Sequence, residues 1–135
     1  MVNGGELRPF ELGDRGTDLR RKLVEAVLRG HKTATSSLRQ EYHPYTSELL
    51  PQVGVQFLLV GHDDEPLGVV ETTELRILAA GDVDMQFARH EGFASVGEWR
   101  AAHARFWSKR GLVATLTDDA LVACERFRLV QKAET

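Results

Sequence analysis

The segment GHKTATSSL, residues 30–38, places a lysine and several hydroxyl side chains within one short stretch. Lys32 and Thr35 are three residues apart. A threonine hydroxyl can act as a nucleophile when a neighbouring lysine, desolvated enough to lose its own proton, takes up the hydroxyl proton. A helix end followed by an edge strand explains the same spacing about as well, with Lys32 donating to the free carbonyls of the helix. Both interpretations stay open on spacing alone.

Other motifs that carry chemistry are missing from the sequence. It contains no GxxxxGK[ST] phosphate loop, no HExxH pair and no CxxC pair, and its five histidines have no ligand spacing. The single cysteine, Cys124, lies in the apolar run ALVACERF, where it fits a small core side chain better than a nucleophile. We therefore expect no metal ion and no cofactor.

Length and composition indicate one folded domain. With 135 residues, 42% of them hydrophobic and 27% charged, the chain matches an ordinary globular domain spanning residues 1–135. The first ten residues, MVNGGELRPF, have no apolar stretch of signal-peptide length, and no run reaches the length of a membrane span. We expect a cytoplasmic protein with no membrane partner, and the sequence gives no indication of an oligomeric state.

The charge is unevenly distributed along the chain. The formal net charge is −3, yet residues 8–39 carry eight basic against four acidic side chains, and residues 95–110 carry four against one. If the fold brings the two stretches together, they form a positive face suited to anionic ligands. Solvated helix faces explain the same pattern and are the commoner outcome.

The coarse pattern predicts an α+β domain. A helix capped by Thr17 or Asp18 should end at Gly30, with Leu19 and Leu23 on its apolar stripe and Arg20 off it. Residues 55–60 and 67–77 read as a β-hairpin around a polar turn, and residues 121–130 as a closing strand.

Two further helices are expected between the hairpin and the last strand. A short one should end at Gly92, and a longer one should begin with a capping box formed by Ser95 and Glu98 and end at Gly111. This element order describes a small antiparallel sheet or barrel flanked by helices.

Five segments in order, GHKTATSSL, LLPQVG, VVETTEL, DVDMQFARHEG and VGEWRAAHARFW, resemble the ASCH domain family over roughly residues 8–130. The family is similar in fold to the PUA-like proteins. The resemblance therefore implies a PUA-like small antiparallel β-barrel flanked by helices, with the first helix packed at its side. It also implies a cleft between barrel and helices, with the GHKTAT segment facing into it.

The resemblance implies a protein that acts on RNA or modified nucleosides. Small bacterial members hydrolyse the N4-acyl amide of acetylated cytidine nucleosides with a lysine, a threonine and a glutamate, which match Lys32, Thr35 and Glu91 here. An amidohydrolase would use Thr35 as nucleophile, Lys32 as base and Glu91 to orient them or to exchange protons with them. Other members imply two alternatives, a non-catalytic RNA-binding module and a ribonuclease. The residues proposed for ribonuclease action are Lys32, Arg100 and His103.

The remaining candidate ligand contacts surround these three residues. They are Ser36, Ser37, Arg39, Tyr42, Arg100 and His103. Many family members carry an arginine where this chain has Ser37, and here Arg39 follows two residues later. After Glu91 and Gly92 the chain continues with Phe93, where the most similar members carry a further acidic residue.

Overall fold

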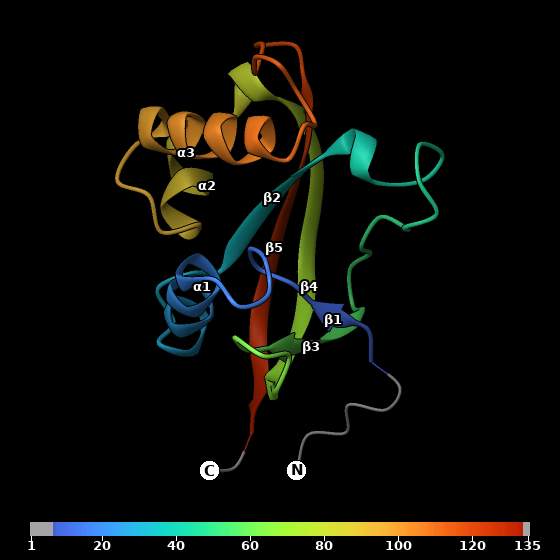
Figure 1. Cartoon of the computed structure of the whole chain (residues 1–135), viewed down its shortest axis with the longest axis vertical. Coiled ribbons are helices and arrows are strands. Elements are labelled where there is room, and N and C mark those ends of the chain that lie inside the picture. The colour runs from blue at the N-terminus through green and yellow to red at the C-terminus, as the bar shows by residue number, and fades with distance from the viewer. Residues whose placement is uncertain (1–6, 134–135) are drawn as a thin grey trace.

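The computed structural model describes residues 7–133; the N-terminal residues 1–6, on which part of the targeting expectation rests, lie outside the described part. The chain contains both strands and helices (Figure 1). In order they are β1 (Pro9–Phe10), α1 (Asp18–Leu28), β2 (Ala34–Leu38), η1 (Arg39–Glu41), β3 (Gln56–Val60), β4 (Pro66–Ala79), η2 (Ala80–Asp82), α2 (Met85–His90), α3 (Val96–Lys109) and β5 (Leu121–Lys132). The predicted α+β class and element order are confirmed.

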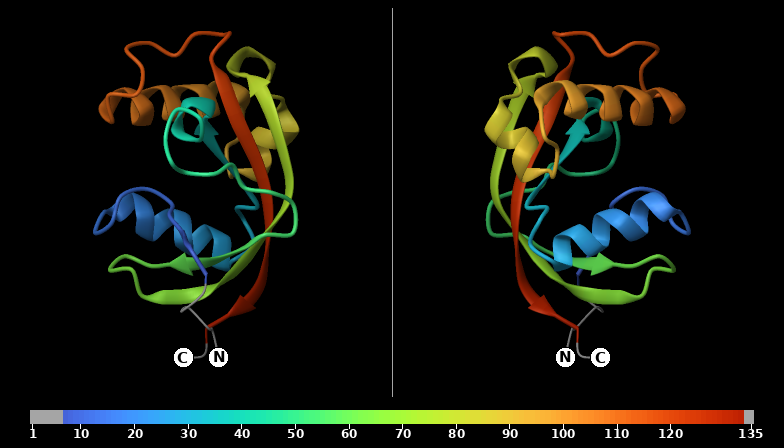
Figure 2. Two further views of the ribbon diagram at one scale, coloured as in Figure 1. Left: turned by 90° about the vertical axis from the view of Figure 1, so that its right-hand side faces the viewer. Right: turned by 90° about the vertical axis from the view of Figure 1, so that its left-hand side faces the viewer.

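The strands form one five-stranded sheet in the order β1-β3-β4-β5-β2. The long strands β4 and β5 bend along their length, so the sheet curls into a half-barrel (Figure 2). The predicted closed, antiparallel barrel is wrong on two points. β1 pairs in parallel with β3, and the edge strands β1 and β2 do not pair with each other. β1 is only two residues long and contains Pro9, which has no N–H to donate, so this edge has little capacity to close a barrel.

Two hydrophobic cores hold the helices against different parts of the curled sheet. α2 and α3 pack around Trp99, Trp107 and Phe87, all fully buried. α1 packs with β1 and β3 around a second group that includes Phe10 and Phe127. Figures 1 and 2 show α1 and α3 beside opposite ends of the long strands. The concave face of the curled sheet therefore faces the space between α1 and α3.

The helix boundaries follow the capping signals in the sequence. Thr17 Oγ1 accepts a hydrogen bond from Arg20 N at 3.2 Å, and Ser95 Oγ accepts one from Glu98 N at 3.1 Å. The Glu98 carboxylate accepts a hydrogen bond from Ala94 N at 3.0 Å. A capping box would instead use the N–H of Ser95, one residue later. These contacts fix where α1 and α3 begin, as predicted.

The predicted apolar stripe of α1 is confirmed at Leu23 and Val27 and wrong at its first turn. Arg20 is buried and Leu19 is exposed. The Arg20 guanidinium donates to Asp64 at 2.8 Å and to Gly13 O at 3.1 Å, so its charge is compensated inside the fold. Arg20 thereby ties α1 to the turn between β3 and β4.

The hairpin and the last strand occur where they were expected. β3 and β4 pair antiparallel, and Pro66 is the first residue of β4, where a missing N–H is tolerated. On β5, Cys124 is completely buried in the α3 core, and burial raises the pKa of its thiol to about 12. Within residues 7–133, no helix has the length and apolar character needed to cross a membrane.

Candidate functional site

The ends of α1 and α2 bring Lys32 beside Glu91. Gly30, with φ of 80°, follows α1, and Gly92, with φ of 99°, follows Glu91 at the end of α2. Glycine adopts this left-handed conformation without strain, which lets each helix stop abruptly. Between the two ends, Thr33 N donates to His90 O at 2.7 Å. This single backbone bond joins the segment before β2 to α2.

Glu91 accepts hydrogen bonds or ion pairs from four side chains although it is itself buried. Its Oε1 lies 3.2 Å from Lys32 Nζ and 3.5 Å from His103 Nε2. Its Oε2 accepts from Trp99 Nε1 at 2.6 Å and from the Ser36 hydroxyl. Both members of the Lys32 and Glu91 pair are almost inaccessible, with side chains 4% and 2% exposed. We call Lys32, Ser36, Glu91, Trp99 and His103 the Glu91 cluster.

The Glu91 cluster stabilises a charged carboxylate. Burial by itself raises the pKa of Glu91, but the nearby Lys32 ammonium, His103 and the Ser36 hydroxyl together lower this pKa well below its ordinary value. A carboxylate that accepts several charge-assisted hydrogen bonds stays ionised throughout the neutral range. Lys32 therefore has a permanent counter-ion in the folded protein.

A second buried glutamate, Glu125 of β5, lies on the face of the sheet opposite to the one on which Ser36 reaches Glu91. In the antiparallel pairing of β2 with β5, Thr35 is directly opposite Glu125 and Ser37 is opposite Ala123. Directly paired residues of antiparallel strands project from the same face of the sheet. Thr35, Ser37 and Glu125 therefore share one face, whereas Ser36 points the other way to Glu91.

Glu125 has far fewer partners than Glu91. Its Oε2 accepts a hydrogen bond from Thr72 Oγ1 at 2.7 Å, and its other oxygen has no hydrogen-bond partner among residues 7–133. The residue is 6% exposed, and this burial raises the pKa of Glu125 to about 7, with the Thr72 hydroxyl as the only opposing influence. Near neutral pH this carboxyl group therefore exists in both protonation states. We call Thr35, Ser37, Thr72 and Glu125 the Glu125 cluster.

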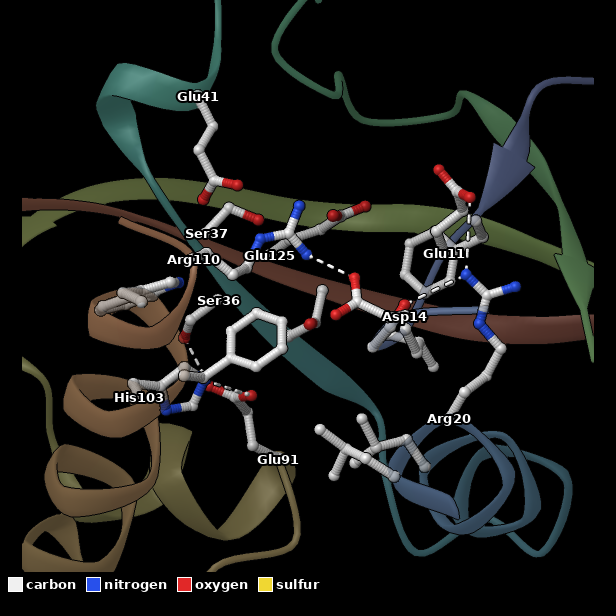
Figure 3. A pocket seen from close by; sticks show the side chains of 18 of the residues that line it. Glu11, Asp14, Arg20, Ser36, Ser37, Glu41, Glu91, His103, Arg110 and Glu125 are labelled. Atoms are coloured by element: carbon white, nitrogen blue, oxygen red, sulfur yellow. Dashed lines mark hydrogen bonds and ion pairs between the residues drawn. The ribbon is translucent and has the colours of Figure 1, made fainter. Parts of the chain in front are cut away.

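One cavity of about 1030 Å³ is lined by residues of both clusters. It extends between α1 and α3, and Figure 3 shows Ser36, Glu91 and His103 together with Ser37 and Glu125 around it. The volume is at the upper end of the range for small-molecule sites. Thr35 lines this cavity, and its hydroxyl has no hydrogen-bond partner within the described part of the chain.

The two basic stretches of the sequence do meet at this cavity, but they do not form a positive face. Arg110 of α3 contacts Asp14 at 3.0 Å, which joins the two stretches (Figure 3). Not counting His103, six basic and six acidic residues line the cavity. The balance of charge does not match the excess of positive charge that long polyanions require.

The structure brings together most, but not all, of the residues expected from the sequence. Lys32, Thr35 and Glu91 line the cavity, as do Ser36, Ser37, Tyr42 and His103. Burial raises the pKa of Tyr42 to about 12, and the Ser37 side chain opposes this shift in part.

Two predicted contacts lie elsewhere. Arg39 contacts His43 O and the Tyr45 ring, and Arg100 pairs with Asp118 at 2.7 Å. Neither arginine lines the cavity. The set of Lys32, Arg100 and His103 proposed for ribonuclease action is therefore not assembled in one place.

Sequence reasoning missed Glu125 and Thr72. Both lie within strands, Glu125 in an otherwise apolar run and Thr72 in the β-branched segment VVETTEL. The glutamate within a predicted buried strand was a signal that could have been noticed. Its partners could not be identified, because they depend on how the strands are aligned in the sheet. Within residues 7–133, no group of three or more His, Cys, Asp or Glu side chains is arranged to hold a metal ion.

Comparison with known proteins places the chain in a family. A family model described as the ASCH domain matches residues 10–131. A crystal structure of a protein from Enterococcus faecalis, assigned to the family DUF984, superposes with a TM-score of 0.81 at 27% identity, covering 96% of this chain and 83% of that one. An ASCH domain from Lactobacillus crispatus gives a TM-score of 0.77 at 26% identity, covering 92% and 79%. The search of curated proteins finds no match. The chain therefore belongs to the ASCH domain family, and its half-barrel is of the PUA-like type.

Proposed function

We propose that this ASCH-domain protein is an amidohydrolase that removes the acyl group from the exocyclic nitrogen of an N-acylated nucleoside, such as N4-acetylcytidine. The observation that carries the proposal is the position of Thr35. Its hydroxyl has no partner within residues 7–133 and lines a cavity that also contains the buried Lys32 and Glu91 pair. A nucleophile without a competing hydrogen bond, in a cavity that also holds fixed donors, meets two requirements of acyl transfer.

The charge of the cavity supports a nucleoside better than a long RNA. Acidic side chains match the basic ones among the lining residues, and the Arg110 guanidinium is already paired with Asp14. A neutral acylated nucleoside carries no phosphate that would be repelled by this acidic content. RNA binding without catalysis remains the main alternative outcome of the test below.

Lys32 is best suited to hold the acyl oxygen. The sequence hypothesis that Lys32 acts as base stays a prediction, but its buried contact with Glu91 favours the ammonium form, which cannot accept a proton. An ammonium group has three N–H donors, and the described structure uses one of them for Glu91. Another donor is available for the negative charge that develops on the acyl oxygen during attack.

The test is hydrolysis of N4-acetylcytidine, followed by chromatography of the nucleoside product. We expect wild-type protein to release cytidine and Thr35→Ala to lose at least about three orders of magnitude in kcat/KM, because the nucleophile is gone. Thr35→Ser should keep measurable activity. Thr73→Ala, a change of an exposed threonine on β4, is the matched control and should leave the rate unchanged.

Two results would contradict the proposal. One is Thr35→Ala that hydrolyses the substrate as fast as wild type. The other is wild-type protein with no hydrolysis but saturable, salt-sensitive binding of short RNAs, which would identify a binding module.

A further inference from the structure

The proposed hydrolysis leaves one requirement unmet within the Glu91 cluster, a group that accepts the proton of Thr35. The Glu91 carboxylate already accepts from Lys32, Ser36 and Trp99, with His103 Nε2 at 3.5 Å, and its low pKa makes it a poor proton acceptor near neutral pH. Lys32 is held as its counter-ion. Ser36 and Trp99 donate to the same carboxylate and are not bases. Both ring nitrogens of His103 are engaged within the cluster, Nδ1 with Trp99 O at 2.8 Å and Nε2 with Glu91 Oε1 at 3.5 Å.

We propose that Glu125 is the proton-transfer residue of this cavity, taking the proton of Thr35 during attack and delivering it to the departing nitrogen. The proposal rests on the function proposed above. Its basis is the register of the sheet, in which Thr35 and Glu125 are direct partners on the same face. Side chains of such pairs start from Cβ atoms only about 5 Å apart, which is close enough for one water to join the carboxylate to the hydroxyl.

Three properties of Glu125 match this role. It lines the cavity yet is 6% exposed, so it is shielded from bulk water. One oxygen is fixed by Thr72 at 2.7 Å, which leaves the other oxygen to exchange a proton. Burial raises its pKa to about 7, so the group can both accept and donate a proton at neutral pH.

The groups around Glu125 leave its charge uncompensated. The facing residues of β2 and β4 are the uncharged Thr35, Ser37 and Thr72. On η1 and directly after it, Glu41 and Tyr42 line the same cavity, and so do Lys32, Glu91 and His103 of the Glu91 cluster. The other charged residues that line it are Glu11, Asp14, Arg15, Arg20, Glu48, Arg105, Lys109 and Arg110. Arg126, the next residue on β5, alternates to the other face of the sheet and is not among the residues lining the cavity. No cation pairs with Glu125 within the described residues.

The proposed reaction is balanced with water as the only co-reactant. Thr35 Oγ forms a bond to the acyl carbon as its proton passes to the Glu125 carboxylate, and the carbonyl electron pair moves to oxygen. The carbon–nitrogen bond then breaks, and Glu125 returns the proton to the amine. Water next attacks the acyl-Thr35 ester and gives a proton to Glu125. When the ester bond breaks, that proton returns to Thr35 Oγ and the acid leaves.

The test uses p-nitrophenyl acetate, an activated ester, and measures acetylation of Thr35 by peptide mass spectrometry in single-turnover reactions across a pH series. We expect the wild-type rate to rise with pH through about 7. Glu125→Gln retains an acceptor for the Thr72 hydroxyl but cannot take a proton, so it should lose roughly 10²- to 10⁴-fold in rate and the pH dependence with it. Glu125→Asp should restore part of both.

The matched control is Glu74→Gln, because Glu74 lies on the neighbouring strand β4 outside the lining of the cavity. Its rate and pH profile should equal those of wild type, and thermal unfolding should confirm that each variant is folded. Glu125→Gln that acetylates Thr35 at the wild-type rate would overturn the assignment, and so would a wild type that is never acetylated there. Acetylation that depends on Glu125, without hydrolysis of N4-acetylcytidine, would uphold Glu125 and refute only the proposed substrate.

Discussion

Glu91 and Glu125 line the same cavity and are both buried, yet their surroundings favour opposite protonation states. Glu91 has a buried lysine at 3.2 Å and three further donors, which hold it as a carboxylate. Glu125 has one neutral hydroxyl at 2.7 Å and no cation, so burial favours its neutral form. Burial alone therefore does not decide the charge of a carboxyl group; the number and charge of its donors do.

Such a difference between neighbouring carboxyl groups is characteristic of acid–base sites. When two environments separate the pKa values of similar groups, one can supply a permanent charge while the other exchanges protons. In this cavity the charged Glu91 orients Lys32, and the titrating Glu125 lies opposite Thr35. The two roles lie on different sides of β2 because successive residues of a strand point to opposite faces.

The largest effect on stability should come from breaking the Glu91 cluster. Glu91→Gln removes the charge that compensates a buried lysine, and we expect a loss of about 3–5 kcal/mol in the free energy of unfolding. Urea unfolding measures the change. The double variant with Lys32→Met should lose less than the sum of the two single variants, because no uncompensated charge then remains. A loss below about 1 kcal/mol in Glu91→Gln would show that the pair is not buried as described.

Glu125 should give a pH dependence of stability with the opposite sign. Its pKa in the folded state, about 7, lies above the ordinary 4.5, so the folded protein retains a proton that the unfolded chain releases. The associated stability, about 3 kcal/mol, is present at acidic pH and is lost as pH rises through about 7. Thermal unfolding of Glu125→Gln should lack this decline.

The same measurement distinguishes Glu91 at lower pH. Its folded-state pKa is depressed, so its contribution is present above about 4.5 and is lost as pH falls further. We expect wild-type stability to be greatest between these two transitions. A neutral-range decline that persists in Glu125→Gln would assign that proton to another group.

The smallest effect should follow changes at Arg100. Its partner Asp118 is exposed, and its second hydrogen bond, to Leu116 O at 2.9 Å, is partly buried, so Arg100→Ala should cost about 1 kcal/mol of stability. Because the side chain lies outside the cavity lining, kcat/KM for N4-acetylcytidine should stay within about twofold of wild type. A tenfold loss would show that Arg100 reaches the ligand, which would extend the site beyond the two clusters.

The fold was largely predictable from local signals, since Thr17 and Ser95 cap their helices and Gly30 and Gly111 follow them. Whether the barrel closes was not predictable, because closure depends on whether the edge strands β1 and β2 pair with each other. The local sequence of neither strand indicates this. Arg20 was missed because its partners Gly61 and Asp64 lie in a turn some forty residues away.

The candidate site was predictable only in part. Lys32, Thr35 and Glu91 could be chosen by resemblance to the family, and the structure places all three at one cavity. Glu125 could not, because its relation to Thr35 arises from the pairing of β2 with β5, about ninety residues apart in the chain. The position of Lys32 and Ser36 on one side of β2 and of Thr35 on the other likewise depends on where the strand begins.

The most direct test of the account is NMR titration of protein labelled with carbon-13 at the glutamate side-chain carboxyl carbon. The signals of Glu91 and Glu125 can be assigned by their disappearance in Glu91→Gln and Glu125→Gln. We predict that the Glu125 signal titrates near pH 7, whereas the Glu91 signal keeps its ionised position down to at least about pH 4. Titration of both carboxyl groups near their ordinary value of 4.5 would contradict the account, because the two clusters would then not differ in charge.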